Sequence, residues 1–253
     1  MVMGITYGTS TLFQATKGIV QDGLVLNLDA GVNKSYPRNG TTWYDLSNTG
    51  NGTLNNGPTF DRDNGGSISF DGTDDNVEIP HNTNQNLSAS NGHSVSVWCK
   101  WISGGGHQDI VSKDSEGGIG REWLITKSSA EKFRYHIWSS SNSAVYQDSN
   151  YTPVSNQWVN LTQVWDGSLL SFYVNGSLDS TKSANVTPKN SNTIMRIGGG
   201  ADSGSAYHFN GSVSSVLVYQ KALTATEVLQ NYNIMKARFG LWYILMENYY
   251  NGH

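Results

Sequence analysis

Apolar and polar residues alternate with period two along most of the chain, and this pattern predicts an antiparallel β-protein. The clearest case is residues 157–177, QWVNLTQVWDGSLLSFYVNGS, where an Asp-Gly pair at 166–167 and an Asn-Gly pair at 175–176 separate three strand segments. Both dipeptides favour the positive φ values of tight hairpin turns. Trp158 and Trp165 bracket the first strand and add a large apolar area. We therefore place this stretch at the centre of an antiparallel sheet.

Segments of the same kind flank this stretch on both sides. In residues 23–30, GLVLNLDA, leucine occupies every second position from 24 to 28, as in a half-buried strand. The other predicted strand regions are SISFDGTDDNVEIP (67–80), SVSVWCKW (94–101), EWLITK (122–127), KFRYHIW (132–138), TIMRIGGG (193–200) and FNGSVSSVLVYQKAL (209–223).

One helix interrupts the β pattern. Thr224 precedes Glu227 by three residues, just before an apolar run. In this capping box the side chain of each residue accepts a hydrogen bond from the backbone N–H of the other. The predicted apolar face of the helix consists of Val228, Leu229, Tyr232 and Met235.

Composition excludes several classes of protein. A net charge of −4 gives no basic field for nucleic acid. Cys99 is the only cysteine and lies in a predicted strand, where a small buried hydrophobe is expected. The sequence MVMGITYGTSTLF lacks the pattern of a signal peptide, and no apolar run reaches the length of a membrane span. We therefore expect a protein that is made in the cytoplasm and does not insert into a membrane.

The order of these motifs resembles a known family. GLVLNLDA, WYDLSNTGNGTLNNGPTF, SISFDGTDDNVEIP, SVSVWCKW, IVSKD, QWVNLTQVWDGSLLSFYVNG, MRIGGG and FNGSVSSVLVYQKALTATEVLQNYN occur in the order found in the laminin-G-like jelly roll of the concanavalin-A-like lectin and glucanase superfamily. Within it, SYPRNGTTWYDLSNTGNGTL and NYNIMKARFG resemble versions found in virion proteins of tailed phages, especially marine ones.

The resemblance implies an all-β fold: a two-sheet antiparallel jelly-roll sandwich, concanavalin-A-like, with one short C-terminal helix and two terminal arms. We expect an N-terminal arm over 1–20, the jelly-roll domain over 21–236 and an apolar C-terminal arm over 237–253.

The resemblance also implies a function. We expect a structural protein on the surface of a phage virion, in a head decoration or a tail or fibre, that assembles with itself and with other virion proteins. The alternative is a lectin module that binds a host surface polysaccharide.

Two departures from the superfamily pattern bear on chemistry. An Asp-Glu pair is common at the start of the closing strand, but Ser214 and Ser215 stand there. Hydrolases of the superfamily carry carboxylates at alternate positions of one strand, and none of the six glutamates falls in such an arrangement with aspartates. Because glycoside cleavage needs paired carboxylates, we expect no enzyme.

An acidic group could bind a cation. Asp71, Asp74 and Asp75 are close in sequence, and Asp45 lies in the long irregular segment before them. Several oxygen ligands from flexible loops suit calcium. The other interpretation is that Asp71 serves an Asp-Gly turn and the others are solvated. We expect a domain without cofactors, with structural calcium as the alternative.

One strand carries candidate ligand-binding residues. Alternation in KFRYHIW places Arg134, His136 and Trp138 on one face of the sheet. An aromatic ring with nearby hydrogen-bond donors suits the mixed faces of a sugar. The alternative is the ordinary polar side of an outer sheet.

The C-terminal arm is rich in large apolar side chains. So large an apolar patch on a soluble monomer is usually an interaction site. We expect these residues to take part in assembly, and the alternative is that the arm folds back on its own sandwich. They are Phe239, Leu241, Trp242, Tyr243, Ile244, Leu245 and Met246.

Overall fold

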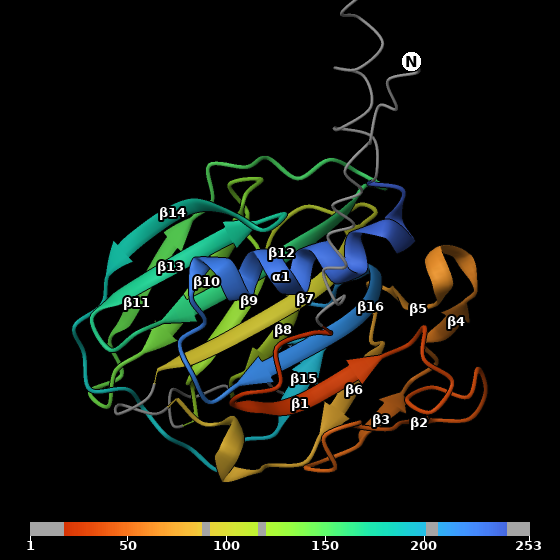
Figure 1. Cartoon of the computed structure of the whole chain (residues 1–253), viewed down its shortest axis with the longest axis horizontal. Helices are drawn as coiled ribbons and strands as arrows, with labels where there is room; N and C mark the ends of the chain where they lie inside the picture. Colours follow the sequence, from red (N-terminus) through yellow and green to blue (C-terminus); the bar gives the residue numbers. More distant parts are fainter. Residues whose placement is uncertain (1–17, 88–91, 116–119, 201–206, 242–253) are drawn as a thin grey trace, which may run out of the picture.

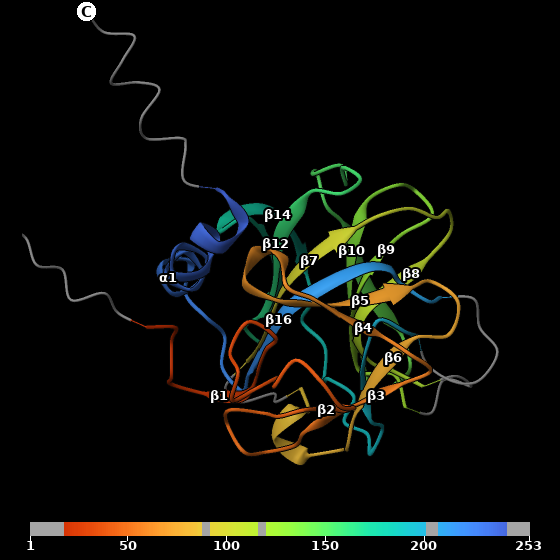
Figure 2. The same ribbon diagram turned by 90° about the vertical axis from the view of Figure 1, so that its right-hand side faces the viewer.

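Two antiparallel β-sheets pack face to face, and one α-helix lies against the outer face of one of them (Figures 1 and 2). The computed structural model describes residues 18–87, 92–115, 120–200 and 207–241. In this part of the chain the prediction of an all-β, two-sheet antiparallel sandwich with one short C-terminal helix is confirmed.

Sheet A has the strand order β14-β13-β12-β7-β16-β5-β4, and β1 pairs with the second half of β16. Its strands are β1 (Leu24–Asp29), β4 (Thr59–Asp61), β5 (Ser67–Asp71), β7 (His93–Trp101), β12 (Trp158–Trp165), β13 (Leu169–Val174), β14 (Ser177–Ser183) and β16 (Asn210–Tyr219).

Sheet B has the order β11-β10-β9-β8-β15-β6-β3-β2. Its strands are β2 (Thr42–Trp43), β3 (Gly52–Asn55), β6 (Asn76–Ile79), β8 (Gln108–Lys113), β9 (Trp123–Lys127), β10 (Phe133–Trp138), β11 (Ala144–Asp148) and β15 (Met195–Ile197). Short 3₁₀ turns cover Asp63–Gly65 (η1) and Thr83–Gln85 (η2).

The main core lies between the two sheets and follows the alternation in the sequence. On β10, Phe133, Tyr135 and Ile137 are buried in it, and on β12, Leu161 and Trp165 are buried from the other side. Tyr135 of sheet B stacks on Phe172 of sheet A with ring centroids 4.6 Å apart. Residues 157–177 thus contribute to the core, but their expected position at the centre of the sheet is wrong: β14 is the edge strand of sheet A, β13 and β12 follow it, and β7 and β16 lie in the middle.

The two dipeptide turns in this stretch differ. Asn175 and Gly176 both have positive φ, 51° and 77°, as a tight hairpin between β13 and β14 requires. In the first turn only Gly167 has positive φ, 98°. There the Asp166 carboxylate accepts hydrogen bonds from the backbone N–H groups of Ser168 and Leu169, at 2.9 and 2.7 Å. This turn is therefore held by an aspartate side chain.

Helix α1 (Ala225–Met235) begins with the expected capping box. The backbone N–H of Thr224 donates to the Glu227 carboxylate at 2.9 Å, and the Thr224 hydroxyl accepts from the Glu227 N–H at 3.3 Å. Val228 and Met235 are buried as predicted, but Leu229 is 45% exposed. Among the described residues, no helix has the length and apolar character needed to cross a membrane.

Asn231 takes the buried position that was predicted for Leu229. Its side-chain amide accepts a hydrogen bond from the Val20 N–H at 2.9 Å and donates to the Tyr219 hydroxyl at 3.0 Å. Because the side of α1 that carries Asn231 faces β16, Leu229 lies on the side of the helix that faces solvent. The predicted helix face is therefore wrong at this position.

Both ends of the described chain pack against the domain. Val20 is buried in a cluster with Tyr219 and Val228, and Gln230 donates to the Gly18 carbonyl at 2.7 Å. After α1, the 3₁₀ turn η4 (Lys236–Phe239) folds back onto the outer face of sheet A. The predicted boundaries are corrected accordingly, because 18–20 and 237–241 belong to the packed domain.

Candidate functional site

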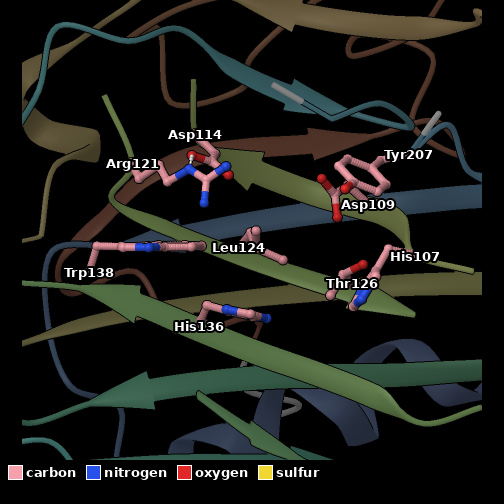
Figure 3. Close-up of a pocket in the computed structure, with 9 residues that line it drawn as sticks. All are labelled: His107, Asp109, Asp114, Arg121, Leu124, Thr126, His136, Trp138 and Tyr207. Carbon is pink, nitrogen blue, oxygen red and sulfur yellow. Dashed lines mark ion pairs between the residues drawn. The ribbon is translucent and has the colours of Figure 1, made fainter. Parts of the chain in front are cut away.

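The main candidate site is a pocket on the outer face of sheet B, formed over β8, β9 and β10 (Figure 3). On β10 the side chains that face away from the core are Arg134, His136 and Trp138, as alternation predicted. On β9, Leu124 and Thr126 point to the same side. The outer face of the sheet is therefore hollowed where these three strands run together.

The pocket encloses about 160 Å³. In Figure 3, Leu124 lies in the middle, with Asp114, Arg121 and Trp138 on one side and Asp109, Tyr207 and His107 on the other. Polar groups thus face one another across an apolar centre. The lining residues are His107, Asp109, Asp114, Arg121, Leu124, Thr126, His136, Trp138 and Tyr207.

Stacked side chains form one wall. His136 lies parallel to Trp138 with centroids 5.1 Å apart, and the Arg121 guanidinium lies 5.5 Å from the Trp138 ring. Figure 3 shows Arg121 and His136 on opposite sides of that ring. Trp138 is consequently only 5% exposed. It supports the wall and is not the open aromatic platform that the sequence suggested.

Arg134 does not line the pocket. Its guanidinium forms two hydrogen bonds with the Asp148 carboxylate, at 2.6 and 2.8 Å, and lies 4.7 Å from the Tyr146 ring. Such a bidentate pair is among the stronger polar contacts. The predicted trio is therefore divided: His136 and Trp138 form the pocket wall, and Arg134 supports the neighbouring strand β11.

Burial alters the acid–base chemistry of the pocket. It raises the pKa of Asp109 to about 7, against the opposing effect of the Thr126 hydroxyl. Burial, helped by the charge of Arg134, lowers the pKa of His136 to about 3. Neither ring nitrogen of His136 has a hydrogen-bond partner among the described residues. The pocket therefore holds a neutral imidazole and a carboxyl group that ionises near neutral pH.

The aspartates proposed as cation ligands do not all come together. Ligand oxygens of Asp71, Asp74 and Asp75 lie within 4.8 Å of one another. Asp75 is largely buried and accepts a hydrogen bond from the Asp71 N–H at 3.0 Å. Three carboxylates are suitable oxygen donors for a hard cation, so calcium at this group stays the alternative to the predicted domain without cofactors.

Asp45 belongs to a different structure. Its carboxylate accepts hydrogen bonds from the backbone N–H groups of Asn27, Ser47 and Thr49, at 2.7 to 2.9 Å. It therefore organises the loop after β2, and it lies outside the acidic group. Its assignment as a fourth cation ligand is wrong, because these backbone groups already use its oxygens.

The closing strand shows what replaces the acidic pair expected there. Ser214 donates to the Gly66 carbonyl at 2.7 Å and accepts from Arg238 of η4 at 2.9 Å. Arg238 also donates to both carboxylate oxygens of Asp29, at 2.8 and 2.9 Å. A guanidinium group thus occupies this position, and it ties η4 to β1 and β16.

The residues proposed for assembly are only partly described. Phe239 is buried against Trp98 and Trp158, with ring centroids 4.1 and 4.8 Å away, and Leu241 packs beside them. Phe239 is therefore part of its own domain: its assignment to assembly is wrong, and the alternative that this segment folds back on its own sandwich holds for it. Trp242, Tyr243, Ile244, Leu245 and Met246 lie outside the described residues.

Sequence reasoning missed most of the pocket. Asp109, Asp114, Arg121 and Tyr207 come from segments that had no evident relation to KFRYHIW. The sequence offered a signal for two of them: in QDIVSKD (108–114), Asp109 and Asp114 flank an apolar strand segment, and acids placed where a strand buries them are candidates for a functional site. Arg121 and Tyr207 have no such signal.

Comparisons with known proteins agree with this architecture. The family model described as the concanavalin A-like lectin/glucanases superfamily matches residues 71–229. No curated protein sequence matches the chain.

Similar solved structures include the binding domains of a mosquitocidal protein and of botulinum neurotoxins. The binding domain of Paraclostridial Mosquitocidal Protein 1 has a TM-score of 0.68 and 17% identity over 83% of this chain and 52% of its own. The botulinum neurotoxin serotype D ligand binding domain in complex with N-acetylneuraminic acid has a TM-score of 0.67 and 13% identity over 84% and 51%. The serotype G binding domain has a TM-score of 0.65 and 15% identity over 85% and 51%. The chain thus spans about half the length of these structures, and the likeness shows the fold.

Proposed function

Since the chain belongs to the concanavalin A-like lectin/glucanases superfamily, we propose that it is a non-catalytic carbohydrate-binding domain whose ligand occupies the pocket of sheet B. One observation carries this proposal. The pocket is a concave site that combines an apolar centre with convergent hydrogen-bonding side chains. This combination is typical of small-molecule sites in proteins.

The size and chemistry of the pocket suit a single sugar ring. A cavity on the order of 150 Å³ accommodates one six-membered ring, and this pocket encloses about 160 Å³. Carboxyl oxygens of Asp109 and Asp114 can accept hydrogen bonds from sugar hydroxyls, and Arg121 can donate to them. Leu124 and the ring of Tyr207 offer apolar contact for the C–H face of the sugar.

Known structures support the carbohydrate assignment. Similar solved structures are binding domains, and one is a complex with N-acetylneuraminic acid. For this chain, the identity of the ligand rests on the pocket itself.

Replacing Tyr207 with alanine should weaken glycan binding about tenfold, because the ring is 41% exposed at the pocket rim and its loss removes an aromatic contact. The backbone of Tyr207 pairs with Asp109 and is retained in this variant. A glycan array followed by calorimetric titration of the best ligand would measure the loss. Tyr44→Ala is the matched control, since Tyr44 is 45% exposed and lies outside the pocket.

Two results would contradict the proposal. Equal loss of binding in the Tyr44 and Tyr207 variants would place the ligand elsewhere. Release of p-nitrophenol from aryl glycosides by the wild-type protein would show that the domain is catalytic.

We further propose that the domain is displayed on the surface of a phage virion, where its ends attach it to other copies or to other virion proteins. The segments SYPRNGTTWYDLSNTGNGTL and NYNIMKARFG support this proposal by their resemblance to virion proteins. So does the large apolar content of residues 242–246, WYILM.

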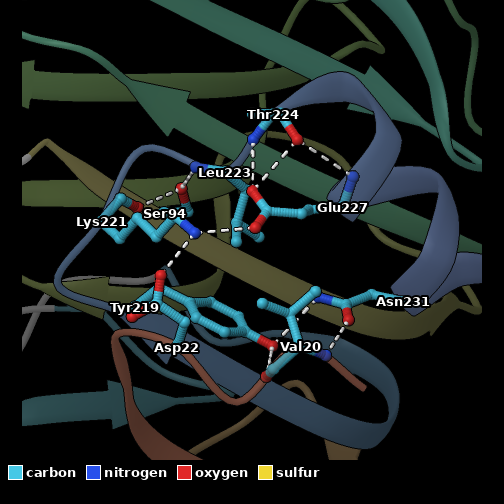
Figure 4. A network of polar contacts seen from close by, with 9 residues as sticks. All are labelled: Val20, Asp22, Ser94, Tyr219, Lys221, Leu223, Thr224, Glu227 and Asn231. Carbon is cyan, nitrogen blue, oxygen red and sulfur yellow. Dashed lines mark hydrogen bonds and ion pairs between the residues drawn. The ribbon is translucent and has the colours of Figure 1, made fainter. Parts of the chain in front are cut away.

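Polar contacts hold the N-terminal segment against β16 and α1 (Figure 4). The Tyr219 hydroxyl donates to the Val20 carbonyl at 3.0 Å, and the Val20 N–H donates to Asn231 at 2.9 Å. Lys221 forms an ion pair with Asp22 at 2.7 Å. A force applied to the N-terminal arm would therefore act on the closing strand of the sandwich and on the helix.

Ending the chain after Leu241 should leave the cooperative melt unchanged and abolish self-association or particle binding. The reason is that Phe239 and Leu241, which pack on sheet A, are kept, and the apolar residues beyond them are removed. Sedimentation velocity and thermal melting would measure the two properties. A second truncation after Met235 removes η4 and should lower the melting temperature. A shortened chain that still assembles like the wild type would disprove the anchoring role.

A further inference from the structure

The charged groups around the pocket are arranged in pairs. Arg121 pairs with Asp114 at 3.4 Å, and Lys127 pairs with Glu131 at 2.6 Å. On the neighbouring edge, Arg134 pairs with Asp148. Each of these three cations therefore already has a carboxylate partner.

The pocket contains one further acid, Asp109, beyond these pairs. Its side chain is almost fully buried at the pocket wall, and no lysine or arginine among the described residues forms an ion pair with it. The titratable groups around it come from every neighbouring element: Asp114 at the end of β8, Arg121 before β9, His107 before β8, His136 on β10 and Tyr207 before β16. Burial lowers the pKa of both histidines, so both are neutral at physiological pH.

Among the residues that line the pocket, no cation is consequently left without a carboxylate partner. The one guanidinium of the pocket is balanced by Asp114, and the ionised form of Asp109 adds a negative charge. A carboxylate that enters such a site loses its hydration and meets like charge, which is costly at low effective dielectric. An uncharged polyol is not repelled by these carboxylates. Its hydroxyl groups can donate hydrogen bonds to them, because ionised carboxylates are strong acceptors.

We propose that this pocket selects an uncharged pyranose over a sialic or uronic acid, with the Asp109 carboxylate accepting hydrogen bonds from ring hydroxyls. This inference rests on the proposed carbohydrate-binding function and specifies the class of ligand. It also gives the pocket a different preference from that suggested by the structural neighbour that holds N-acetylneuraminic acid.

The proposal has a consequence for pH dependence. Asp109 has a pKa of about 7 in the free protein. A ligand that donates hydroxyl hydrogens to the carboxylate favours its ionised form, so binding lowers this pKa and releases a proton. Affinity for a neutral sugar therefore rises as the pH increases through 7. Affinity for an acidic sugar falls over the same range, because the two negative charges repel each other.

The test is calorimetric titration of the full chain at pH 5.5 and 8.5. The neutral probes are the methyl glycosides of galactose, glucose, mannose and N-acetylglucosamine. The acidic probes are the methyl glycosides of N-acetylneuraminic acid and glucuronic acid. We expect at least one neutral probe to bind more tightly than either acidic probe. The affinity for that neutral probe should be about tenfold higher at pH 8.5 than at pH 5.5 if the pKa of Asp109 falls by one unit on binding. Titrations in buffers of different ionisation enthalpy should show proton release near pH 7.

Asp109→Asn should abolish the proton release and the pH dependence, and it should reduce the affinity for neutral sugar about tenfold at pH 8.5. The control is Asp63→Asn, which should change none of these properties, because Asp63 is exposed and lies outside the pocket. Tighter binding of an acidic probe by the wild-type protein would overturn the selectivity and leave carbohydrate binding standing. Binding of neutral sugar with no proton release would overturn the role of Asp109. Failure of both classes of probe to bind would overturn the proposed function itself.

Discussion

Replacing Trp165 with alanine is expected to lower the free energy of unfolding by about 3–5 kcal/mol. The side chain is buried between the two sheets, and its indole N–H donates to the Ala184 carbonyl at 2.9 Å. The substitution would remove a large apolar surface and leave a cavity in the core, and it would take away one of the two donors of that carbonyl, the other being the Val186 N–H. Chemical denaturation monitored by circular dichroism would measure the change.

Leu178→Ala is the control for this experiment. Leu178 lies on β14 and is exposed, so its truncation should change stability by less than about 0.5 kcal/mol. Similar losses for the two variants would show that the core is not concentrated around Trp165.

Replacing Glu122 with glutamine is expected to cost about 3–5 kcal/mol of stability, although the two side chains have nearly the same shape. Glu122 and Lys113 are both fully buried, and their ion pair has a separation of 2.6 Å. The same carboxylate accepts hydrogen bonds from the Ser191 N–H and the Ser191 hydroxyl, at 2.6 and 2.9 Å. Removing its charge leaves the Lys113 ammonium buried without compensation, which accounts for most of the expected loss.

A double-mutant cycle separates this explanation from a general loss of packing. Lys113→Met combined with Glu122→Gln removes both charges, so the double variant should be more stable than Glu122→Gln alone. Additive losses in the cycle would show that the two charges do not interact.

The buried ion pair also bears on the pocket. Lys113 directly precedes Asp114, and Glu122 directly follows Arg121. The pair therefore fixes the two strand ends that carry one wall of the pocket. We expect Glu122→Gln to weaken ligand binding as well as stability, even though Glu122 does not line the pocket.

Local patterns in the sequence predicted the elements of the fold well. The strand pattern and the two turn dipeptides in residues 157–177 identified β12, β13 and the start of β14, and the spacing of Thr224 and Glu227 identified the start of α1. Each of these features depends on residues within a few positions of one another. A pattern in the sequence is therefore sufficient to find them.

The pocket depends on contacts between distant segments, which no local pattern reports. Alternation placed Trp138 on the correct face of β10, but its burial results from Arg121, which the β8–β9 connection brings over the ring. Phe239 was assigned to assembly, with folding back on its own sandwich as the alternative, because the 3₁₀ turn that packs it onto Trp98 leaves no periodic trace in the sequence. In both cases tertiary packing decided the environment of the side chain.

The packing of both chain ends beside α1 determines how the domain would present its pocket. Gly18 bonds to α1, and Leu241 packs on the outer face of sheet A, whereas the pocket opens on the outer face of sheet B. A larger body joined to either end would lie behind the pocket. Copies arranged around such a body would all direct their pockets outward, toward a surface that carries repeated sugars. Simultaneous engagement of several weak sites would then raise the overall avidity by about 10²–10⁴ over that of one pocket.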